Sequence, residues 1–466
     1  MVFSSLTFLL IFLPLLYLLY FLRRSVRWRN GVLLVMSLLF YGWGEPLWIL
    51  AMLVSTFANY FCARAISRSE SEPRRKLILA VGVVFSLSFL FYFKYSAFFA
   101  NTFYRLLGLS RTAAARRLPI GISFYTFQIL TYTVDVYRKK APAQANPLRL
   151  LLYISCFPQL IAGPIVQYGD VADQLGERRI LPDDFSAGLQ RFVKGLAKKV
   201  LMANVCGAAI EKMPLAGSGQ ALSLLGAWFS MFLFSLQIYY DFSAYSDMAI
   251  GMGRTLGFRY KENFNFPFAS HSITEFFRRW HISMASFFRD YLYIPLGGSR
   301  RGTARTVLNM LIVWALTGLW HGASWNFVLW GSYFGLLLII ERFLLRDRLA
   351  RLPKALQWLW FAVVFWPNWP IFFYTDLSAA AEGLRALFGV GISGLTDAAS
   401  LGVLRDYGIW ALVGFVLSLP VVPAVSARLP EKLRDALGIV LTLLLFVTSL
   451  FFLIGQSYNP FIYFRF

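Results

Sequence analysis

The stretch LTGLWHGASWNFVLWG, residues 316–331, is apolar and aromatic except for a few small polar residues and one histidine, His321. The 466-residue chain has only three histidines, and His271 and His281 precede His321 within the same window. Outward from this stretch, similar apolar runs fill the sequence, with 58% hydrophobic and only 15% charged residues. A soluble protein could not cover its surface with this composition. The sequence therefore predicts an all-helical integral membrane protein.

Apolar segments recur along the whole length, so the membrane domain is predicted to comprise residues 1–466. A hydrocarbon core of about 30 Å takes roughly 20 helical residues. The first run has no small-residue cleavage site and is expected to be retained as a span. Residues 350–466 carry few charges and are predicted to be scaffold helices. The expected segments, not all of them full crossings, are 5–22, 31–63 (a hairpin turned at 44–46), 77–108, 119–137, 147–166, 186–210, 220–252, 304–320, 325–345, 356–375, 403–424 and 435–455.

Four of these segments are unlikely to be simple spans. Segment 77–108 contains Lys94 and is long, which favours a kink, a tilt or an interfacial second half. Pro119 suits the first turn of the helix over 119–137. The prolines and glycine of FPQLIAGPIV, residues 157–166, favour a broken or re-entrant element. Segment 186–210 carries four basic residues and is predicted to lie amphipathically at the interface, with Arg191, Lys194, Lys198 and Lys199.

The net charge of +22 comes from 45 basic and 23 acidic residues. Arginines at 23–29 and basic residues at 64–76 follow the first and third apolar runs, so the positive-inside rule places both loops in the cytoplasm and the N-terminus outside. Other basic residues fall away from these loops, and both an anionic ligand and lipid headgroups fit them. These residues are Arg178, Arg179, Arg278, Arg279, Arg289, Arg300, Arg301 and Arg305.

The chain shows none of several common functional signatures. Cys62, Cys156 and Cys206 lie far apart and predict neither a disulfide framework nor a zinc site. Glycine-rich phosphate loops, HExxH motifs and nucleic-acid modules are absent, so no metal and no nucleic-acid partner is expected. Function should therefore come from polar side chains at membrane depth, where they are costly.

Residues 270–290, SHSITEFFRRWHISMASFFRD, carry the first polar cluster. Ser272 and Glu275 have the spacing of a capping box, which predicts a helix from Ser272 toward Asp290. Helical periodicity would give it a polar face with Glu275, Arg278, His281, Ala285 and Arg289, and an opposite packing face with Ile273, Phe276, Trp280 and Phe287. Glu275 is either a cap or functional. His281 is either a hydrogen-bonded histidine of the packed bundle or part of a site.

His321 ends the next predicted helix, whose N-terminal end carries Arg300, Arg301 and Arg305 and whose expected C-cap is Gly322. About 17 helical residues place this histidine roughly 25 Å from the basic end. Gly318 would allow another backbone to approach closely. His321, beside Trp320, is therefore the favoured candidate for a base.

A third cluster, residues 237–253, is rich in hydroxyl groups and contains Tyr240, Asp241 and Asp247. These side chains could orient a histidine or link helices by hydrogen bonds. The irregular segment ENFNFPF follows, with Asn263 and Asn265 as possible amide donors.

Acyl transfer to a hydroxyl fits these groups best. A neutral imidazole can take the proton of the attacking hydroxyl, and a second histidine or an amide can steady the oxyanion. Arginines near the cytoplasmic mouth would suit the phosphates of a thioester donor such as coenzyme A. Two rivals stay open: a proton-coupled transporter of polysaccharide or lipid, and a non-catalytic export scaffold.

Several motifs together resemble the membrane-bound O-acyltransferase family, in particular its alginate O-acetyltransferase branch and the related teichoic-acid D-alanyl transferases. The resemblance covers most of residues 1–345. It rests on FRRWHISMASFFRDYLYIPLGG (277–298), LTGLWHGASWNFVLWG (316–331), MVFSSLTFLLIFLP (1–14), PIGISFYTFQILTYTVDVYR (119–138), FPQLIAGPIV (157–166) and YYDFSAYSDMAIGMG (239–253).

The resemblance implies a ring of tilted transmembrane and re-entrant helices around a central tunnel, with a catalytic core at about 119–345. The family's catalytic histidine maps to His321 in WHGA and its second histidine to His281 in RRWHIS, whereas His271 matches no functional position. Residues expected to bind the donor or support the histidines are Arg278, Arg289, Asp290, Trp320, Tyr240, Asp241, Asp247 and Asn263.

The same resemblance implies a multi-pass protein of the bacterial inner membrane without a permanent cofactor. Acetyl-CoA or another acyl thioester would be the donor, and an exported polysaccharide such as alginate would be the acceptor. Expected partners are membrane lipids, an acyl carrier protein on the cytoplasmic side and extracytoplasmic proteins that complete polysaccharide modification. D-alanyl transfer to teichoic acid and acetylation of peptidoglycan or cellulose are the alternatives within the family.

Overall fold

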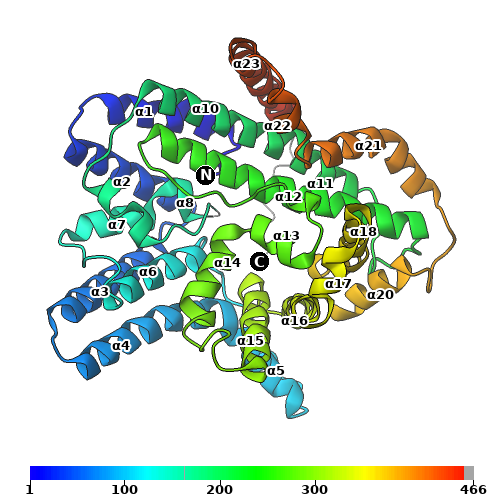
Figure 1. Ribbon diagram of the computed structural model, residues 1–466, viewed down its shortest axis with the longest axis horizontal. Helices are drawn as coiled ribbons and strands as arrows, with labels where there is room; N and C mark the ends of the chain where they lie inside the picture. The colour runs from blue at the N-terminus through cyan, green and yellow to red at the C-terminus, as the bar shows by residue number, and fades with distance from the viewer. Residues whose placement is uncertain (162, 456–466) are drawn as a thin grey trace. The chain divides into compact units, whose positions relative to one another are not determined.

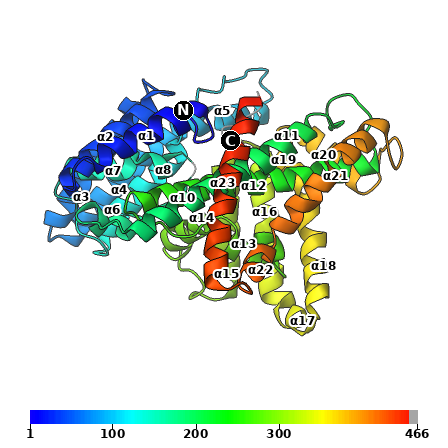
Figure 2. The same cartoon turned by 90° about the horizontal axis from the view of Figure 1, so that it is seen from above.

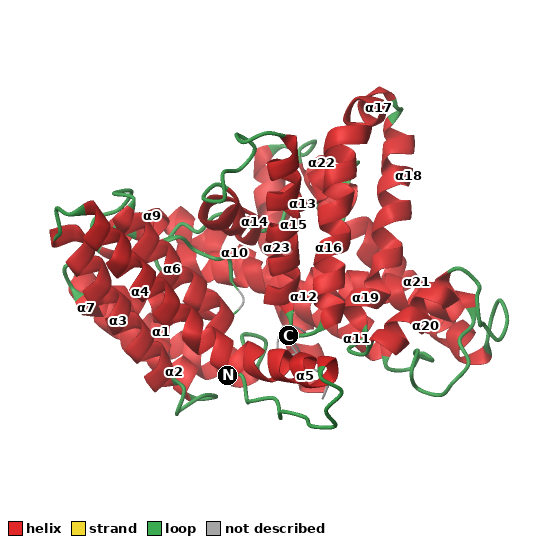
Figure 3. Ribbon diagram, turned by 90° about the horizontal axis from the view of Figure 1, so that it is seen from below, coloured by secondary structure: helices red, strands yellow, loops and turns green. Residues whose placement is uncertain are grey.

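The computed structural model describes residues 1–161 and 163–455, and all regular elements within them are helices (Figure 3). This confirms the all-helical class. By length and composition, five of the described helices could cross a membrane: Ile49–Arg68, Glu72–Leu106, Trp325–Arg351, Ala398–Leu417 and Glu431–Gly455. The first apolar run forms a shorter apolar helix, Phe8–Phe21.

The chain divides into two compact units. The first comprises Met1–Lys194 and Tyr245–Glu262. It contains the helices α1 (Leu13–Phe21), α2 (Val26–Gly42), α3 (Ile49–Arg68), α4 (Glu72–Leu90), α5 (Ser96–Leu106), α6 (Ile122–Tyr137), α7 (Pro147–Ser155), α8 (Phe157–Leu160), α9 (Tyr168–Val171) and most of α10 (Pro182–Ala197).

Helices α3, α4 and α6 lie side by side in the first unit (Figure 1). Asn59 of α3 joins them, because its Nδ2 donates to Oγ of Ser86 at 2.7 Å and its Oδ1 accepts from Oγ1 of Thr133 at 2.9 Å. Interhelical hydrogen bonds of this kind hold helices together where lipid supplies no hydrophobic driving force.

The second unit comprises Gly195–Ala244 and the chain from Asn263 onward. Helix α12 (Leu224–Thr255) contributes to both units. The other helices are α11 (Asn204–Ile210), α13 (Ile273–Arg279), α14 (Ile282–Phe288), α15 (Thr303–His321), α16 (Trp325–Ile340), α17 (Arg346–Arg351), α18 (Lys354–Phe365), α19 (Trp369–Phe373), α20 (Leu377–Leu387), α21 (Ala398–Leu417), α22 (Val421–Ser426) and α23 (Glu431–Gly455).

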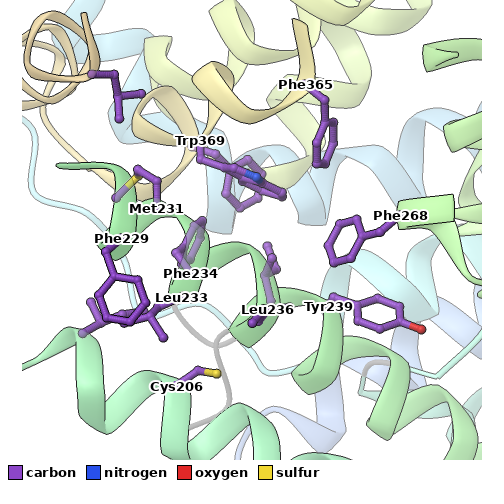
Figure 4. Close-up of a cluster of buried hydrophobic side chains, with 14 of the residues drawn as sticks. Cys206, Phe229, Met231, Leu233, Phe234, Leu236, Tyr239, Phe268, Phe365 and Trp369 are labelled. Atoms are coloured by element: carbon purple, nitrogen blue, oxygen red, sulfur yellow. The ribbon is translucent and has the colours of Figure 1, made fainter. Parts of the chain in front are cut away.

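Aromatic side chains from distant parts of the chain form the core of the second unit. Phe234 of α12 packs edge-on against Trp369 of α19 at 5.4 Å, and Phe268 lies 6.0 Å from Phe365 of α18 (Figure 4). Such offset and edge-to-face pairs stabilise beyond the area they bury. Helix α17 forms the turn that joins α16 to α18 (Figure 2).

Two of the irregular segments follow expectation. Segment 77–108 is interrupted by a π-helical turn, Phe91–Tyr95, that contains Lys94. The stretch that begins at Pro147 breaks at Cys156 between α7 and α8. The hairpin at 31–63 is also present, with its turn between α2 and α3.

Two expectations need correction. Pro119 lies outside α6, which begins at Ile122 after Gly121 adopts a left-handed conformation at φ 77°. The interfacial interpretation of 186–210 is wrong for Lys199, whose side chain is only 5% exposed. Its Nζ lies 2.7 Å from a carboxylate oxygen of Asp241 on α12, and a buried cation requires such a partner.

Candidate functional site

The hairpin of α15 and α16 places His321 inside the second unit. A methyl group added at Gly318 would lie 2.0 Å from the carbonyl oxygen of Phe327, and one added at Gly331 would lie 2.2 Å from that of Trp314. Only glycine allows this backbone approach, as expected for Gly318. The two helices consequently run side by side in opposite directions (Figure 3). Helix α15 ends at His321 with Gly322 as its C-cap, as predicted.

Aromatic rings surround the His321 imidazole, and the residue is 5% exposed. Trp330 of α16 and Phe372 of α19 pack edge-on against this ring, with distances between ring centroids of 5.1 and 5.6 Å. The indole of the preceding residue, Trp320, lies at 5.1 Å. Phe372 belongs to the C-terminal part predicted as scaffold, so that part also contributes to the surroundings of His321.

The prediction of one continuous helix over 272–290 is wrong. Helix α13 ends at Arg279, and α14 begins only at Ile282. His281 interrupts them with φ 45° and ψ 51°, a left-handed conformation that non-glycine residues rarely adopt. The polar face expected on a single helix is therefore divided, with Glu275 and Arg278 before the break and Arg289 after it.

Asn263 supports the break at His281. Its backbone oxygen accepts from the N–H of Ile282 at 3.0 Å, and its Oδ1 accepts from the N–H and Oγ of Ser283 at 3.2 and 2.8 Å. These bonds satisfy donors at the start of α14 that have no intrahelical partner. Strained conformations persist when their surroundings hold them in this way, and they cluster at functional sites.

The same amide oxygen defines the tautomer of His281. Nδ1 lies 3.2 Å from Oδ1 of Asn263, and an oxygen that already accepts from Ser283 must also accept from the imidazole. Nδ1 therefore carries the proton, and Nε2 presents its lone pair. Among the described residues, no side chain or backbone group hydrogen-bonds to this buried Nε2.

The two histidines share a neighbour. The indole of Trp320 lies 5.9 Å from the His281 ring and 5.1 Å from the His321 ring. On another side, Phe242 of α12 packs edge-on against His281 at 4.6 Å. His281 is fully buried, so the break after α13 and the end of α15 deliver both imidazoles to one interior region of the second unit.

Glu341, directly after α16, anchors the start of α13. Its Oε1 accepts from the N–H of Ile273 at 2.8 Å, and its Oε2 accepts from the N–H and Oγ1 of Thr274 at 2.8 and 2.7 Å. Trp360 of α18 adds its indole N–H at 3.2 Å. A buried carboxylate at a helix N-terminus is stabilised by these donors and by the helix dipole.

Two neighbouring cavities lie along α13 and α15. The larger, of about 590 Å³, is lined by Arg278, Arg342 and Arg346 together with His271 and Glu275. The smaller, of about 210 Å³, has Arg289 and Arg342 among mainly apolar side chains.

Both cavities share Met310 and Arg342 in their linings. The smaller one extends to Thr317, one turn before His321, and to Met284, three residues after His281. Neither lining includes His281, His321 or Trp320, so the two cavities share helices with the histidines but do not reach them.

The ends of α13 give two predicted residues structural contacts. Ser272 accepts from the N–H of Glu275, which confirms the cap. Burial alone would raise the pKa of the Glu275 carboxyl, but the backbone N–H of His271 and the guanidinium of Arg279 outweigh burial and hold that pKa below its ordinary value. His271 also lies 3.4 Å from this carboxylate.

The remaining predicted residues lie elsewhere. Asp241 pairs with Lys199, Tyr240 donates to the carbonyl oxygen of Gly414 at 2.5 Å, and Asp247 pairs with Arg191 at 2.9 Å. These contacts link helices. Arg289 pairs with the adjacent Asp290 at 2.8 Å beside the smaller cavity, and Asn265 is exposed.

Sequence reasoning missed Glu341, Trp330 and Phe372. An acidic residue ending a long apolar run was a usable signal for Glu341, because ionisable residues at such positions need partners. Trp330 and Phe372 could not be distinguished from the many aromatic residues of the core.

Comparisons with known proteins agree with the resemblance noted in the sequence. Residues 136–375 match the model of the membrane-bound O-acyltransferase family. A probable alginate O-acetylase of Azotobacter vinelandii is 37% identical over the whole of both chains. A peptidoglycan O-acetyltransferase of Helicobacter pylori is 32% identical over 85% of this chain and 81% of its own length. A teichoic acid D-alanyltransferase of Bacillus subtilis is 25% identical over 52% of this chain and 62% of its own length.

Proposed function

Since the chain belongs to the membrane-bound O-acyltransferase family and is an O-acetyltransferase, we propose that it moves acetyl from a cytoplasmic thioester to an exported polysaccharide. The acceptor is a hydroxyl of an alginate-like chain, or of a partner protein that completes the transfer. The observation that carries this proposal is the delivery of His281 and His321 to one Trp320 indole. Two cavities partly lined by arginines lie along α13 and α15, the helices that lead to these histidines.

The basic end of the cavities is the proposed entrance for the donor. Arginines 300 and 301 precede α15 and Arg305 lies in its first turn, whereas arginines 342, 346, 348 and 351 follow α16. Because α15 and α16 run in opposite directions, both sets lie at the same end, which the positive-inside rule assigns to the cytoplasm of the inner membrane. Arg278 and Arg342 would hold donor phosphates, and the slim apolar cavity would take the thioester arm.

His321 is proposed as the general base. Its imidazole takes the proton of the acceptor hydroxyl while that oxygen bonds to the acetyl carbonyl carbon. The carbon–sulfur bond then breaks, and the imidazolium returns the proton to the leaving thiolate, giving an ester and a free thiol. General-base catalysis of this type contributes about 10² to 10⁴ in rate.

His281 assists through Nε2. With Nδ1 donating to Asn263, Nε2 can accept a hydrogen bond from a second hydroxyl of the acceptor and so position the attacking hydroxyl, whose one proton goes to His321. This role differs from stabilising an oxyanion, which would need a proton on Nε2. The aromatic rings around His321 would keep bulk water away from the thioester.

The acceptor and partners follow from the relatives. Alginate is named for relatives over the full chain length, and peptidoglycan for a relative over most of it. D-alanyl transfer from a carrier protein is the second candidate within the family, since a more distant relative is named for it. Extracytoplasmic modifying proteins are the proposed partners that finish acetylation.

A transfer assay in lipid nanodiscs tests the proposal. Purified protein receives radiolabelled acetyl-CoA, or an acetylated carrier protein, and an oligouronate acceptor. The proposal expects labelled ester with the parent chain and at least about 10² less with His321→Ala, whose folding is checked by thermal unfolding. A transporter or an export scaffold would produce no labelled ester with any donor, and that result would reject the proposal.

A further inference from the structure

Both ends of the first unit carry basic residues, but they come from different segments of the chain. At one end, the loop after α1 and the adjoining ends of α2, α3 and α4 carry basic residues, and three more follow α6. They are Arg23, Arg24, Arg27, Arg64, Arg68, Arg74 and Lys76, then Arg138, Lys139 and Lys140. Arg75 of α4 donates to the carbonyl oxygen of Tyr137 at 2.6 Å, which shows that the start of α4 and the end of α6 lie together. The positive-inside rule assigns this end to the cytoplasm.

Residues 105–117, which are the last two residues of α5 and the segment after it, are here called the arginine loop and lie at the opposite end of the unit. Arg117 pairs at 3.1 Å with Glu45, in the turn between α2 and α3. That turn is one helix length from the basic starts of α2 and α4. The 19 residues of α4 span about 29 Å, close to a hydrocarbon core, so α5 and the arginine loop emerge on the far side. The arginine loop is therefore extracytoplasmic, where the positive-inside rule predicts few arginines.

The arginine loop carries several positive charges, and no acidic residue is near it in the sequence. It holds Arg105, Arg111, Arg116 and Arg117, all exposed, and no acidic residue occurs between Glu72 and Asp135. Glu45, from the α2–α3 turn, is the carboxylate paired with Arg117.

Local contacts give the arginine loop a defined shape. Asn101 of α5 donates from Nδ2 to the carbonyl oxygen of Ala113 at 3.0 Å, and its Oδ1 accepts from the Ala113 N–H at 2.6 Å. The guanidinium of Arg116 stacks over the Tyr92 ring at 4.2 Å. A stacked guanidinium keeps its N–H edge available for a carboxylate, which it can bind with two parallel hydrogen bonds.

Lipid headgroups explain these arginines poorly. Apolar anchors lie on α5, where Phe99, Phe103 and Leu106 are exposed, whereas residues 108–117 have Leu109 as their one large apolar side chain. The part with Arg111, Arg116 and Arg117 therefore faces water.

We infer that the arginine loop captures a carboxylated polysaccharide on the extracytoplasmic side. This inference rests on the proposed function only for the identity of the ligand, because one of the two acceptors proposed there is a chain of acidic sugars. Regularly spaced carboxylates complement several guanidinium groups at once, and a water-facing cationic surface also speeds the encounter with a polyanion.

Direct binding tests the inference without any donor present. A fluorescent oligouronate is titrated against the full chain in nanodiscs of zwitterionic lipid, and a neutral cello-oligosaccharide is the uncharged control. Arg111→Ala/Arg116→Ala should weaken oligouronate binding about tenfold. The matched control, Arg24→Ala/Arg27→Ala, removes the same charge from exposed positions at the cytoplasmic end and should bind like the parent chain.

Three results would overturn the inference. The arginine-loop variant could bind oligouronate as tightly as the parent chain, or the cytoplasmic control could lose as much affinity. The third is a loss of oligouronate affinity that occurs only in vesicles containing phosphatidylglycerol and not in the zwitterionic nanodiscs. The last would make the arginines lipid anchors. Because binding is measured without a thioester, failed acetyl transfer with retained binding would count against the proposed function alone. Charge-preserving Arg111→Lys/Arg116→Lys should restore part of the affinity, since lysine lacks the bidentate edge.

Discussion

His321 and His281 reach the same interior region by different backbone devices. His321 ends a regular helix that glycines press against its neighbour, whereas His281 sits in a left-handed conformation between two short helices. The first device depends on the adjacent hairpin. The second depends on Asn263, 18 residues earlier, and on Glu341, 68 residues after Ile273.

Because of this difference, substitutions around the two histidines should have different effects on the fold and on activity. The position of His321 is determined by the close backbone contact between α15 and α16. A substitution at that contact should therefore affect the whole fold of the second unit. The position of His281 is determined by a few polar contacts, so changes there should lower activity while most of the fold persists.

Gly318→Ala should have the largest effect. Its methyl group would clash with the backbone of α16 at 2.0 Å, and such overpacking costs about 1–3 kcal/mol or more. We expect loss of folded protein, measured by thermal unfolding in detergent and by yield. Gly402→Ala is the matched control, because α21 leaves open space there and alanine favours a helix. Equal stability of both variants would contradict the proposed packing constraint.

Asn263→Ala should lower the transfer rate about 100-fold while the protein stays folded. It removes the oxygen that accepts hydrogen bonds from Ser283 and from Nδ1 of His281. The backbone conformation at His281 and the position of the imidazole proton then lose their support. The rate and unfolding temperature are compared with those of Asn265→Ala, an exposed amide in the same segment. Similar rates for the two variants would show that His281 needs no support.

Glu341→Gln should reduce activity about tenfold and lower the unfolding temperature moderately. An amide can accept at only one of its two ends, so some donors among Ile273, Thr274 and Trp360 lose their partner. Asp347→Asn, an exposed change six residues later, is the control. If Glu341→Gln leaves both quantities unchanged, the start of α13 is held by other contacts.

Arg278→Ala should have the smallest effect of this series. It shortens one side chain of the larger cavity without touching the break at His281. We expect KM for acetyl-CoA to rise about tenfold with kcat preserved, because a donor-phosphate contact is lost. Arg428→Ala, exposed and outside both cavities, should behave as the parent chain. A fall in kcat alone would instead give Arg278 a role in positioning His281.

The features that could be predicted from the sequence are local ones. The apolar spans, the end of α15 at Gly322 and the close approach at Gly318 each follow from periodicity or from a glycine within a few residues. The cap at Ser272 follows from its spacing to Glu275.

The break at His281 could not be predicted, because neither glycine nor proline marks it. Helical periodicity favours a continuous helix there, and the amide of a distant asparagine overrides it. The burial of Lys199 depends in the same way on Asp241 of another helix. Contacts between distant segments decided each of these positions, and one sequence contains no direct record of them.

The proposed acetyl-transfer mechanism depends most directly on the imidazole at position 321. Single-turnover acetyl transfer should be measured for the parent chain, His321→Ala and His281→Ala in nanodiscs, with donor binding measured in parallel. We expect His321→Ala to bind donor normally but to transfer acetyl about 10³-fold more slowly, and His281→Ala to be impaired less. A folded His321→Ala variant that transfers acetyl at the parent rate would contradict this mechanism.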